Sequence, residues 1–239
     1  MKYYLAVDIG ASSGRHIVGH EEGGKLVTEE VYRFPNGVKE ERGHLVWDID
    51  ALFSHVKAGI RAAFEKHPQI ESLAIDTWAV DYVLFKGEEE VRPCYAYRDG
   101  RTKQAVEEVH RKVPFEKLYE RTGIQFQPFN TVYQFTDDMM QGRLDGVTGF
   151  LMIPEYLSYK LTGVGAHEYT NATTTGLVNA KTGEYDKELI KELGLPETLF
   201  GAIVQPGYEL GELLPDIQSE VGGNTKVILC ASHDTASAV

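Results

Sequence analysis

Two aspartates at opposite ends of the sequence are the side chains best suited to chemistry. Asp8 follows an apolar run over residues 3–7 and precedes a loop of small residues, and Asp234 follows a second apolar run over residues 227–231. If both runs are buried strands, one carboxylate can hold a metal-bound phosphate while the other accepts the proton of an attacking hydroxyl. This pairing predicts phosphoryl transfer, provided that the two strands lie side by side.

The loop after Asp8 has the composition of a phosphate site. Its small residues let backbone N–H groups approach phosphate oxygens, and two hydroxyls and an arginine add donors: Ala11, Ser12, Ser13, Gly14 and Arg15. Asp8 suits Mg²⁺, which prefers oxygen ligands. Neither a GxxxxGK[ST] nor a GxGxxG pattern is present. The alternative is an ordinary tight hairpin with an aspartate at its mouth.

The segment His233-Asp234-Thr235 is the candidate proton-transfer site. Asp234 can accept a proton from a sugar hydroxyl within hydrogen-bond reach, and His233 can orient that sugar. The alternative is a helix N-cap aspartate beside a structural histidine.

A third polar segment, Asp76 to Asp81, contains a tryptophan. An exposed edge of Trp78 beside two carboxylates suits a polyol, which has an apolar face and several hydroxyls. The alternative is a core tryptophan with a turn aspartate. Further along, Arg98 or Arg101 is expected to pair with Asp99 on the surface.

The elements that must position these residues follow from periodicity and turn signals. Strands over 2–8, 15–20 and 25–34 predict an antiparallel meander that turns at Gly23-Gly24. Asp48 or Asp50 caps a helix that runs to about Lys66. Further segments are a strand pair or a strand and loop over 72–85, helices over 102–112, 114–121, 131–141 (capped by Asn130), 154–161 and 187–193, and a last strand over 226–231. We therefore expect an α/β fold with a mixed sheet.

Composition narrows the choice of partners. The formal net charge of −12 argues against nucleic acid, because phosphate-backbone binding needs a basic surface. No apolar run is long enough for a membrane span or a signal peptide, so we expect no membrane partner and a cytoplasmic location. The two cysteines, Cys94 and Cys230, are expected to be free thiols.

Taken together and in order, these motifs resemble the FGGY carbohydrate kinases. The resemblance is carried by residues 8–15, 75–81, 97–102, 123–126, 129–131, 169–175 and 232–239. It implies an actin-like, ribonuclease-H-like domain with a mixed β-sheet flanked by helices. It further implies that residues 1–239 are the N-terminal, sugar-binding domain, inactive as a kinase without a C-terminal ATP-binding domain of the same polypeptide.

The resemblance also implies roles for individual residues. Asp234 matches the family's proton acceptor, Ala11 to Arg15 match its ATP-phosphate loop, and Asp8 lies where Mg²⁺ is expected. The sugar-contacting positions are expected to be Trp78, Ala79, Asp81, Asn130, Gln134, His233, Asp234 and Thr235. Ala79 stands where the family usually has glycine, so its methyl either narrows the pocket or fills a gap.

The expected reaction is ATP-dependent phosphorylation of a ketose, L-rhamnulose, at its primary hydroxyl. The Trp78 loop and the threonine run over 170–175 favour that sugar. The alternatives are another FGGY substrate (xylulose, fuculose or glycerol) and a non-catalytic actin-like sugar-binding module.

Overall fold

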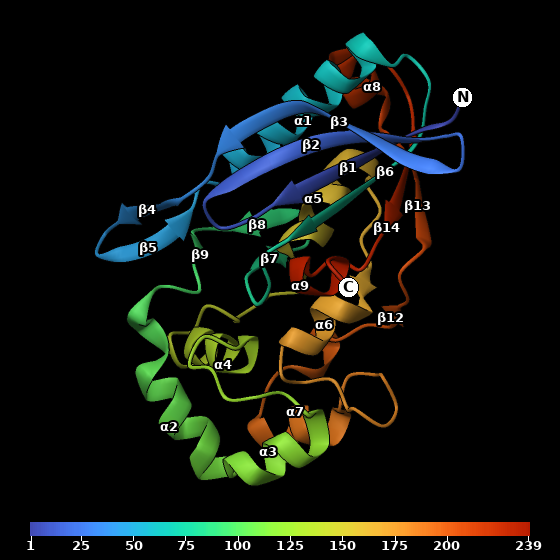
Figure 1. Ribbon diagram of the computed structural model, residues 1–239. Helices are drawn as coiled ribbons and strands as arrows, with labels where there is room; N and C mark the ends of the chain where they lie inside the picture. Colours follow the sequence, from blue (N-terminus) through green and yellow to red (C-terminus); the bar gives the residue numbers. More distant parts are fainter.

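The computed structural model describes residues 1–239, and its centre is a six-stranded mixed sheet (Figure 1). The strand order is β13-β14-β6-β1-β2-β3. β6 is parallel to both β1 and β14, whereas β2, β3 and β13 run antiparallel to their neighbours. The bounds are β1 (Tyr3–Ile9), β2 (Ser13–Glu22), β3 (Lys25–Pro35), β6 (Ile70–Thr77), β13 (Tyr208–Glu212) and β14 (Lys226–Leu229). The predicted mixed sheet and α/β class are confirmed.

The first three strands form the predicted meander. Tyr4 pairs with Gly19 across β1 and β2, and Glu22 pairs with Lys25 across β2 and β3. Gly23 and Gly24 have φ values of 59° and 77°, which other residues adopt only at a cost. The glycine pair therefore sets the predicted turn.

The two faces of the sheet differ in burial. Alternate residues of β1 are fully buried, whereas Tyr4 and Ala6 on the opposite face are exposed and Asp8 is half-buried. β6 follows the same alternation, so Asp76 is half-buried on the face that carries Asp8. This open face bears the polar ends of the strands, while the other face forms the core.

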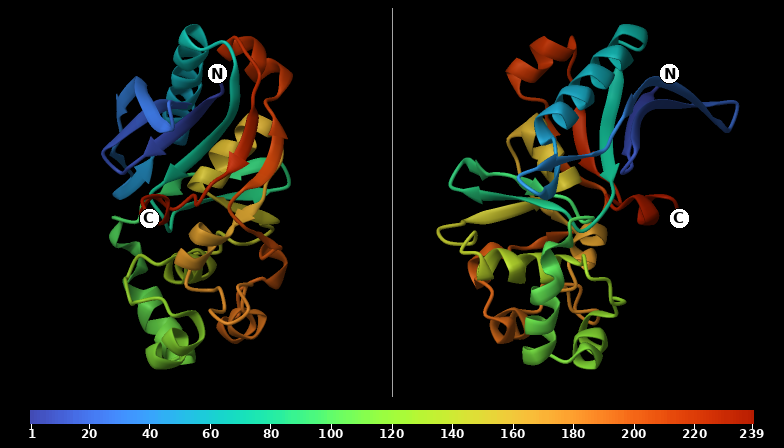
Figure 2. Two further views of the ribbon diagram at one scale, coloured as in Figure 1. Left: turned by 45° about the vertical axis from the view of Figure 1, so that its right-hand side comes forward. Right: turned by 90° about the vertical axis from the view of Figure 1, so that its left-hand side faces the viewer.

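Three helices pack on the buried face: α1 (Ile49–Lys66), α5 (Ile153–Thr162) and α8 (Pro215–Val221) (Figure 2). Asp48 caps α1 by accepting from the Ala51 N–H at 2.9 Å, as one of the two predicted caps. Leu52, Val56, Ile60 and Ala63 recur at helical spacing and are at most 4% exposed. Helical periodicity thus predicted both the extent and the buried side of α1.

A smaller sheet separates two hydrophobic cores. It has the order β10-β7-β8, with β10 (Gly149–Met152), β7 (Tyr82–Lys86) and β8 (Glu89–Val91). Side chains alternate along β7, so Val83 and Phe85 join the core under the large sheet, whereas Tyr82 and Leu84 join the second core. The predicted segment 72–85 therefore splits into β6 and β7, which belong to different sheets.

The second core fills a mostly helical lobe (Figure 1, lower half). Its helices are α2 (Lys103–Lys112), α3 (Phe115–Thr122), α4 (Thr131–Met140), α6 (Tyr169–Thr174) and α7 (Lys187–Leu193), with 3₁₀ turns η1 (Gly100–Thr102) and η2 (Glu197–Leu199). The predicted helices are confirmed, and Gly123 ends α3 with a φ of 69°. The threonine run over 170–175 forms most of α6, which periodicity did not reveal.

Several short elements were not predicted. They are β4 (Val38–Glu41), β5 (His44–Trp47), β9 (Cys94–Tyr95), β11 (His167–Glu168) and β12 (Ile203–Val204), together with α8, β8, β10 and β13. Most span two to five residues, too few to show a period. The four-residue α9 (Asp234–Ser237), in contrast, lies where the small residues after Asp234 indicate the start of a helix. No helix is both long and apolar enough to cross a membrane.

Candidate active site

Neighbouring parallel strands bring the predicted acidic residues together at the carboxyl ends of the strands, a region called the acidic edge below. Asp8 and Asp76 are direct register partners on β1 and β6. One residue further, the Thr77 N–H donates to the Ser232 carbonyl at 3.0 Å, and Thr77 bridges to His233. The turn that carries Asp234 therefore lies beside the end of β6 (Figure 1).

The electrostatics of Asp76 show how close these carboxylates are. Burial, together with the neighbouring negative charges of Asp8 and Asp234, raises the pKa of Asp76 to about 7. Both carboxylates thus act on the same group from its two sides. Asp76 was not among the predicted site residues, although it stands in the segment 76–81 that the sequence singled out.

The loop after Asp8 is held rigidly. Arg15 forms an ion pair with Asp8, with Nε 3.0 Å from Oδ2 and both side chains more than a third exposed. Within the loop the Gly10 N–H donates to the Ser13 carbonyl at 2.9 Å, and Asn36 donates through Nδ2 to the Gly10 carbonyl at 2.8 Å. Ser12 at the tip is exposed. Asn36, which sequence reasoning missed, is the residue that fastens this loop to the end of β3.

Gly14 is required by packing. A Cβ atom at Gly14 would lie 2.2 Å from the Phe34 ring, so only glycine fits between β2 and β3 at this point. Its place in the small-residue loop therefore has a structural reason that is independent of phosphate binding. Ala11, Ser12, Ser13, Gly14 and Arg15 remain a predicted phosphate loop.

Asp234 is the first residue of α9 and is accessible, with 40% of its side chain exposed. Its Oδ1 accepts from the Thr235 N–H at 2.6 Å and lies 3.4 Å from His233 Nε2. Burial lowers the pKa of His233, so its ring is neutral at pH 7. Since no lysine or arginine pairs with Asp234, its carboxylate is free to meet a substrate hydroxyl.

The prediction that an edge of Trp78 is exposed is wrong. Trp78 is 5% exposed and packs against Trp47 with ring centroids 4.1 Å apart. Its Nε1 donates to Asp81 Oδ2 at 3.0 Å. The cause is the unpredicted strand β5, which places a second tryptophan over the first.

Asp81 is the centre of a buried hydrogen-bond network rather than a surface acceptor. It is 1% exposed and also accepts from Trp47 Nε1 at 2.6 Å, the Tyr97 N–H at 2.9 Å and Gln134 Nε2 at 3.0 Å. Burial raises its pKa to about 6, so it is ionised at pH 7. The four donors supply the stabilisation that water would otherwise give the carboxylate.

Two further predicted pocket residues, Gln134 and Asn130, are buried as well. Gln134 is 2% exposed and donates to the carbonyl of Phe129 at 3.0 Å. Asn130 is 7% exposed, and its Oδ1 accepts from the Gln127 N–H at 2.8 Å. Asn130 is the N-cap residue of α4, as predicted, but its side chain makes no capping bond to the helix.

The accessible side of this network is an aromatic cavity. A cavity of about 570 Å³ is lined by Tyr97, Arg98, Phe126 and Phe129, together with residues of η1 and α2. Tyr97 and Phe129 meet edge to face with centroids 5.4 Å apart, and each is tied through its backbone to the Asp81–Gln134 pair. Their occurrence in the polar segments 97–102 and 129–131 was the sequence signal that could have identified them.

Between the network and the acidic edge lies a strained turn. Val80 has a φ of 68° and is 6% exposed, a conformation that is unfavourable for a β-branched residue. Its carbonyl accepts from Thr131 Oγ1 at 2.7 Å and from Gln134 Nε2 at 3.1 Å. These bonds hold the turn, and half-buried Ala79 lies beside it.

The expected surface ion pair between Arg101 and Asp99 does not form, because Arg101 pairs with other residues inside the protein. Its side chain is 5% exposed and donates to Asp137 at 2.7 Å and Asp138 at 2.8 Å on α4. Asp99 instead accepts from the Leu45 N–H and the Arg101 backbone N–H. The arginine therefore joins η1 to α4 inside the protein.

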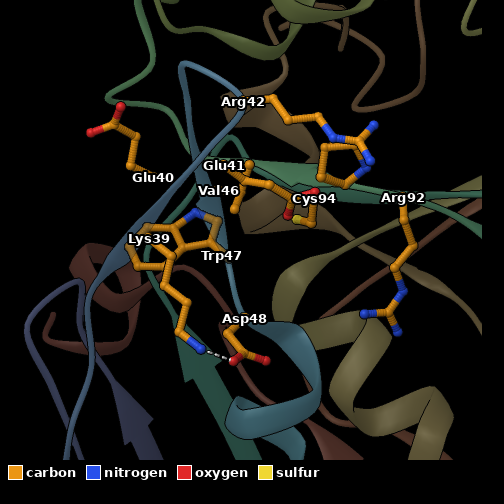
Figure 3. Close-up of a pocket in the computed structure, with 10 residues that line it drawn as sticks. Lys39, Glu40, Glu41, Arg42, Val46, Trp47, Asp48, Arg92 and Cys94 are labelled. Atoms are coloured by element: carbon orange, nitrogen blue, oxygen red, sulfur yellow. Dashed lines mark hydrogen bonds and ion pairs between the residues drawn. The ribbon is translucent and has the colours of Figure 1, made fainter.

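A second cavity, of about 530 Å³, lies at the β4–β5 hairpin (Figure 3). It contains none of the predicted site residues. Among its charged side chains, Lys39 contacts Asp48 and Arg92 donates to Asp50 at 2.7 Å, whereas Glu40, Glu41 and Arg42 form no ion pair. Both cysteines are free, and burial raises the pKa of Cys230 to about 12.

Five strands of the large sheet follow the order β3-β2-β1-β6-β14, and only β2 runs antiparallel to the other four. This arrangement defines an actin-like, ribonuclease-H-like fold. Over residues 3–239 the sequence matches the N-terminal domain of the FGGY family of carbohydrate kinases. The chain belongs to this family.

Relatives and solved structures agree with the assignment. The chain is 47% identical over 238 residues to the rhamnulokinase of Oceanobacillus iheyensis, and this alignment covers 98% of the chain and 51% of that relative. It is 41% identical to the rhamnulokinase of Bacillus subtilis, covering 99% and 49%. A ligand-bound xylulose kinase from Lactobacillus acidophilus shares the fold with a TM-score of 0.84 at 20% identity, covering 98% of this chain and 48% of that one. The chain thus spans about half the length of the relatives it matches.

Proposed function

We propose that this chain is the sugar-binding half of an ATP-dependent cytoplasmic ketose kinase whose substrate is L-rhamnulose, and that a C-terminal domain of the same polypeptide supplies most of the ATP site. The observation that carries the proposal is the meeting of Asp8, Asp76 and Asp234 at the ends of neighbouring strands. The choice of sugar is supported by relatives named rhamnulokinase at 39–47% identity.

In this proposal Asp234 accepts the proton of the sugar's primary hydroxyl as that oxygen attacks the γ-phosphate of ATP. Its accessible carboxylate and the absence of a cationic partner fit a general base. His233, neutral at pH 7, is placed to orient the sugar hydroxyls together with Thr235. Positioning and electrostatics supply most of the catalysis in such reactions.

The chain's residues also fit a magnesium ion. No three acidic, histidine or cysteine side chains converge into a metal site of their own. Mg²⁺ in nucleotide sites is instead held by one or two carboxylates together with water and substrate phosphates, and Asp8 and Asp76 offer such oxygens. When bound, Mg²⁺ would neutralise charge on the phosphoryl oxygens.

The loop from Ala11 to Arg15 is proposed to position the ATP phosphates. Ser12 is exposed at its tip, and Asn36 holds the loop backbone by donating from Nδ2 to the Gly10 carbonyl and from its N–H to the Ser12 carbonyl at 3.0 Å. Arg15 carries positive charge beside Asp8, which offsets the acidic edge toward which a polyanion must move.

The sugar is proposed to lie between Asp234 and the Tyr97–Phe129 cavity. In this arrangement four of the predicted contacts do not touch the sugar: Trp78, Asp81, Asn130 and Gln134. They instead hold the Ala79 turn and the Tyr97–Phe129 pair in place. Aromatic faces with a few polar groups suit a sugar, which has apolar C–H patches.

The proposal is tested in a fusion of this chain to the C-terminal half of the Oceanobacillus iheyensis rhamnulokinase, using a coupled ADP assay. We expect L-rhamnulose to be preferred over L-fuculose, D-xylulose and glycerol. In the fusion, Asp234→Asn should lower kcat at least about 100-fold, because a positioned general base contributes roughly 10²–10⁴-fold.

The matched control is Asp216→Asn, an exposed aspartate on α8, which should keep full activity. Calorimetry on the chain alone should show that Asp234→Asn leaves sugar binding within a few-fold of the parent. An Asp234→Asn fusion that turns over near the parent rate would remove Asp234 from this role.

A further inference from the structure

We propose that Glu168 is a positioning residue for the His233–Asp234 turn, an inference that rests on the proposed function of Asp234. The starting point is how little holds Asp234 directly. Its carboxylate is bonded only by Thr235, the next residue, with His233 at 3.4 Å. The place of Asp234 is therefore set by the backbone of residues 232 and 233.

That backbone is fastened mainly to one carboxylate. Glu168 Oε2 accepts from the Ser232 N–H at 3.0 Å and from Ser232 Oγ at 2.6 Å. The His233 N–H donates to Thr170 Oγ1 at 3.2 Å, and that hydroxyl donates in turn to Glu168 Oε2 at 2.6 Å. On the other side, the turn meets the end of β6 through the Thr77 N–H, which donates to the Ser232 carbonyl, and through the bridge between Thr77 and His233.

Glu168 is an unusual anchor. It is fully buried (0% exposed), and no lysine, arginine or histidine forms an ion pair with it. A buried carboxylate without a cation is costly unless hydrogen bonds satisfy it. Besides the Ser232 and Thr170 hydroxyl bonds it accepts from the Thr170 N–H at 2.8 Å and the Asn171 N–H at 3.3 Å, so it also caps α6.

A second buried carboxylate fixes the anchor itself. Glu155 on α5, 1% exposed, accepts through Oε1 from the Glu168 N–H at 2.7 Å and through Oε2 from the Met152 N–H at 2.9 Å. Glu155 lies on α5, which packs on the large sheet. The position of Asp234 is therefore fixed relative to the core by a chain of hydrogen bonds that runs through Glu155, Glu168 and Ser232. The N-cap residue of the threonine-rich helix α6, Glu168, is thus the residue that holds the turn before Asp234.

The capping and positioning roles separate in one variant, Glu168→Asp. Aspartate is a preferred N-cap and can still accept from the first-turn N–H groups of α6. Its side chain is one methylene shorter and falls short of Ser232. We therefore expect α6 and the fold to persist while the turn at 232–234 loosens.

Two measurements test this. In hydrogen–deuterium exchange on the chain, Glu168→Asp should speed exchange of the Ser232 and His233 amides at least tenfold and leave β1 and β2 unchanged. In the active fusion, kcat for L-rhamnulose should fall about 10- to 100-fold while KM for ATP changes less than twofold. Glu184→Gln, an exposed glutamate in the same lobe, is the control and should change neither quantity.

Parent-like exchange at 232–233 in Glu168→Asp would overturn the proposal, as would an equal loss of protection throughout the chain. The exchange measurement needs no kinase activity. If Asp234→Asn keeps full turnover while Glu168→Asp loosens the turn, the proposed function fails and the anchoring contact stands.

Discussion

At the scale of residues, the same side-chain type serves different ends according to its surroundings. Asp234 is accessible, Asp76 has a pKa of about 7 because it is buried between two carboxylates, and Asp81 is satisfied by four donors. All three follow or flank apolar strands in the sequence. Only their partners distinguish a candidate base from a structural acceptor.

His16 provides a pH test at this scale. It is fully buried, its Nε2 donates to the Val56 carbonyl at 3.1 Å, and burial, aided by nearby His55, lowers its pKa to about 4. Between pH 6.5 and 4 the unfolded chain binds a proton at this position that the folded chain does not, so stability falls as pH falls through this window. At about 1.4 kcal/mol per pKa unit, the loss between pH 7.5 and pH 5 is about 2 kcal/mol.

Urea unfolding of the parent chain and of His16→Gln at these two pH values measures this contribution. Glutamine keeps a donor but does not titrate, so the drop should be smaller in the variant by about 2 kcal/mol. Asp76 and Asp81 titrate in both proteins and cancel in the difference. Equal drops in the two proteins would contradict the buried, neutral His16.

At the scale of elements, close approach of helix to sheet decides which residues are allowed. α1 lies so near β2 that a Cβ at Gly59 would come within 2.3 Å of the His16 ring. Helical propensity alone favours alanine over glycine there by about 1 kcal/mol. Overpacking a core costs about 1–3 kcal/mol, and the His16 ring is held by its bond to α1.

We therefore expect Gly59→Ala to destabilise the chain by about 1–2 kcal/mol despite its better propensity. Chemical denaturation measures the change. In a His16→Ala background the same substitution should become neutral or stabilising, because the ring is gone. A loss of equal size in both backgrounds would show that the helix–sheet distance is not the cause.

At the scale of the whole molecule, two cores share the sheet β10-β7-β8, and the Asp81 network seals the junction between them. Both tryptophans of the chain, Trp47 and Trp78, donate to Asp81 at this junction. Gln134 on α4 joins from the opposite lobe, and the Tyr97 N–H joins from the segment that follows β9. Tryptophan fluorescence therefore reports on the junction, and far-ultraviolet circular dichroism reports on the helices of both lobes.

Asp81→Asn should weaken the junction by about 2–3 kcal/mol, because the amide is uncharged and keeps only one acceptor oxygen, so its NH₂ group must face at least one of the four donors that converge on the carboxylate. Urea unfolding followed by both signals should coincide in the parent, whereas in the variant the fluorescence midpoint should come at lower urea. The exposed Asp145→Asn is the control and should leave both midpoints in place. Coincident, unshifted transitions in Asp81→Asn would count against this role.

Much of the framework was predictable from local sequence. The glycine-turned meander, the Asp48-capped helix and the final strand all have strong periodic or capping signals and are confirmed. The strands of two to four residues have no such signal, and one of them, β5, is the reason that Trp78 is a core residue. The sugar-contact and phosphate-loop roles remain predictions.

What the sequence determined by itself was the longer strands and helices, the buried side of α1 and the family, because periodicity, caps and ordered motifs are local and survive without contacts. What only the tertiary structure decided was which polar residues are free. Asp81 and Gln134 are taken up by partners from other elements, whereas Asp234 is left accessible and Glu168 is placed beneath it. Hydrogen bonds between residues tens of positions apart make that choice, and the spacing of residue types does not record them.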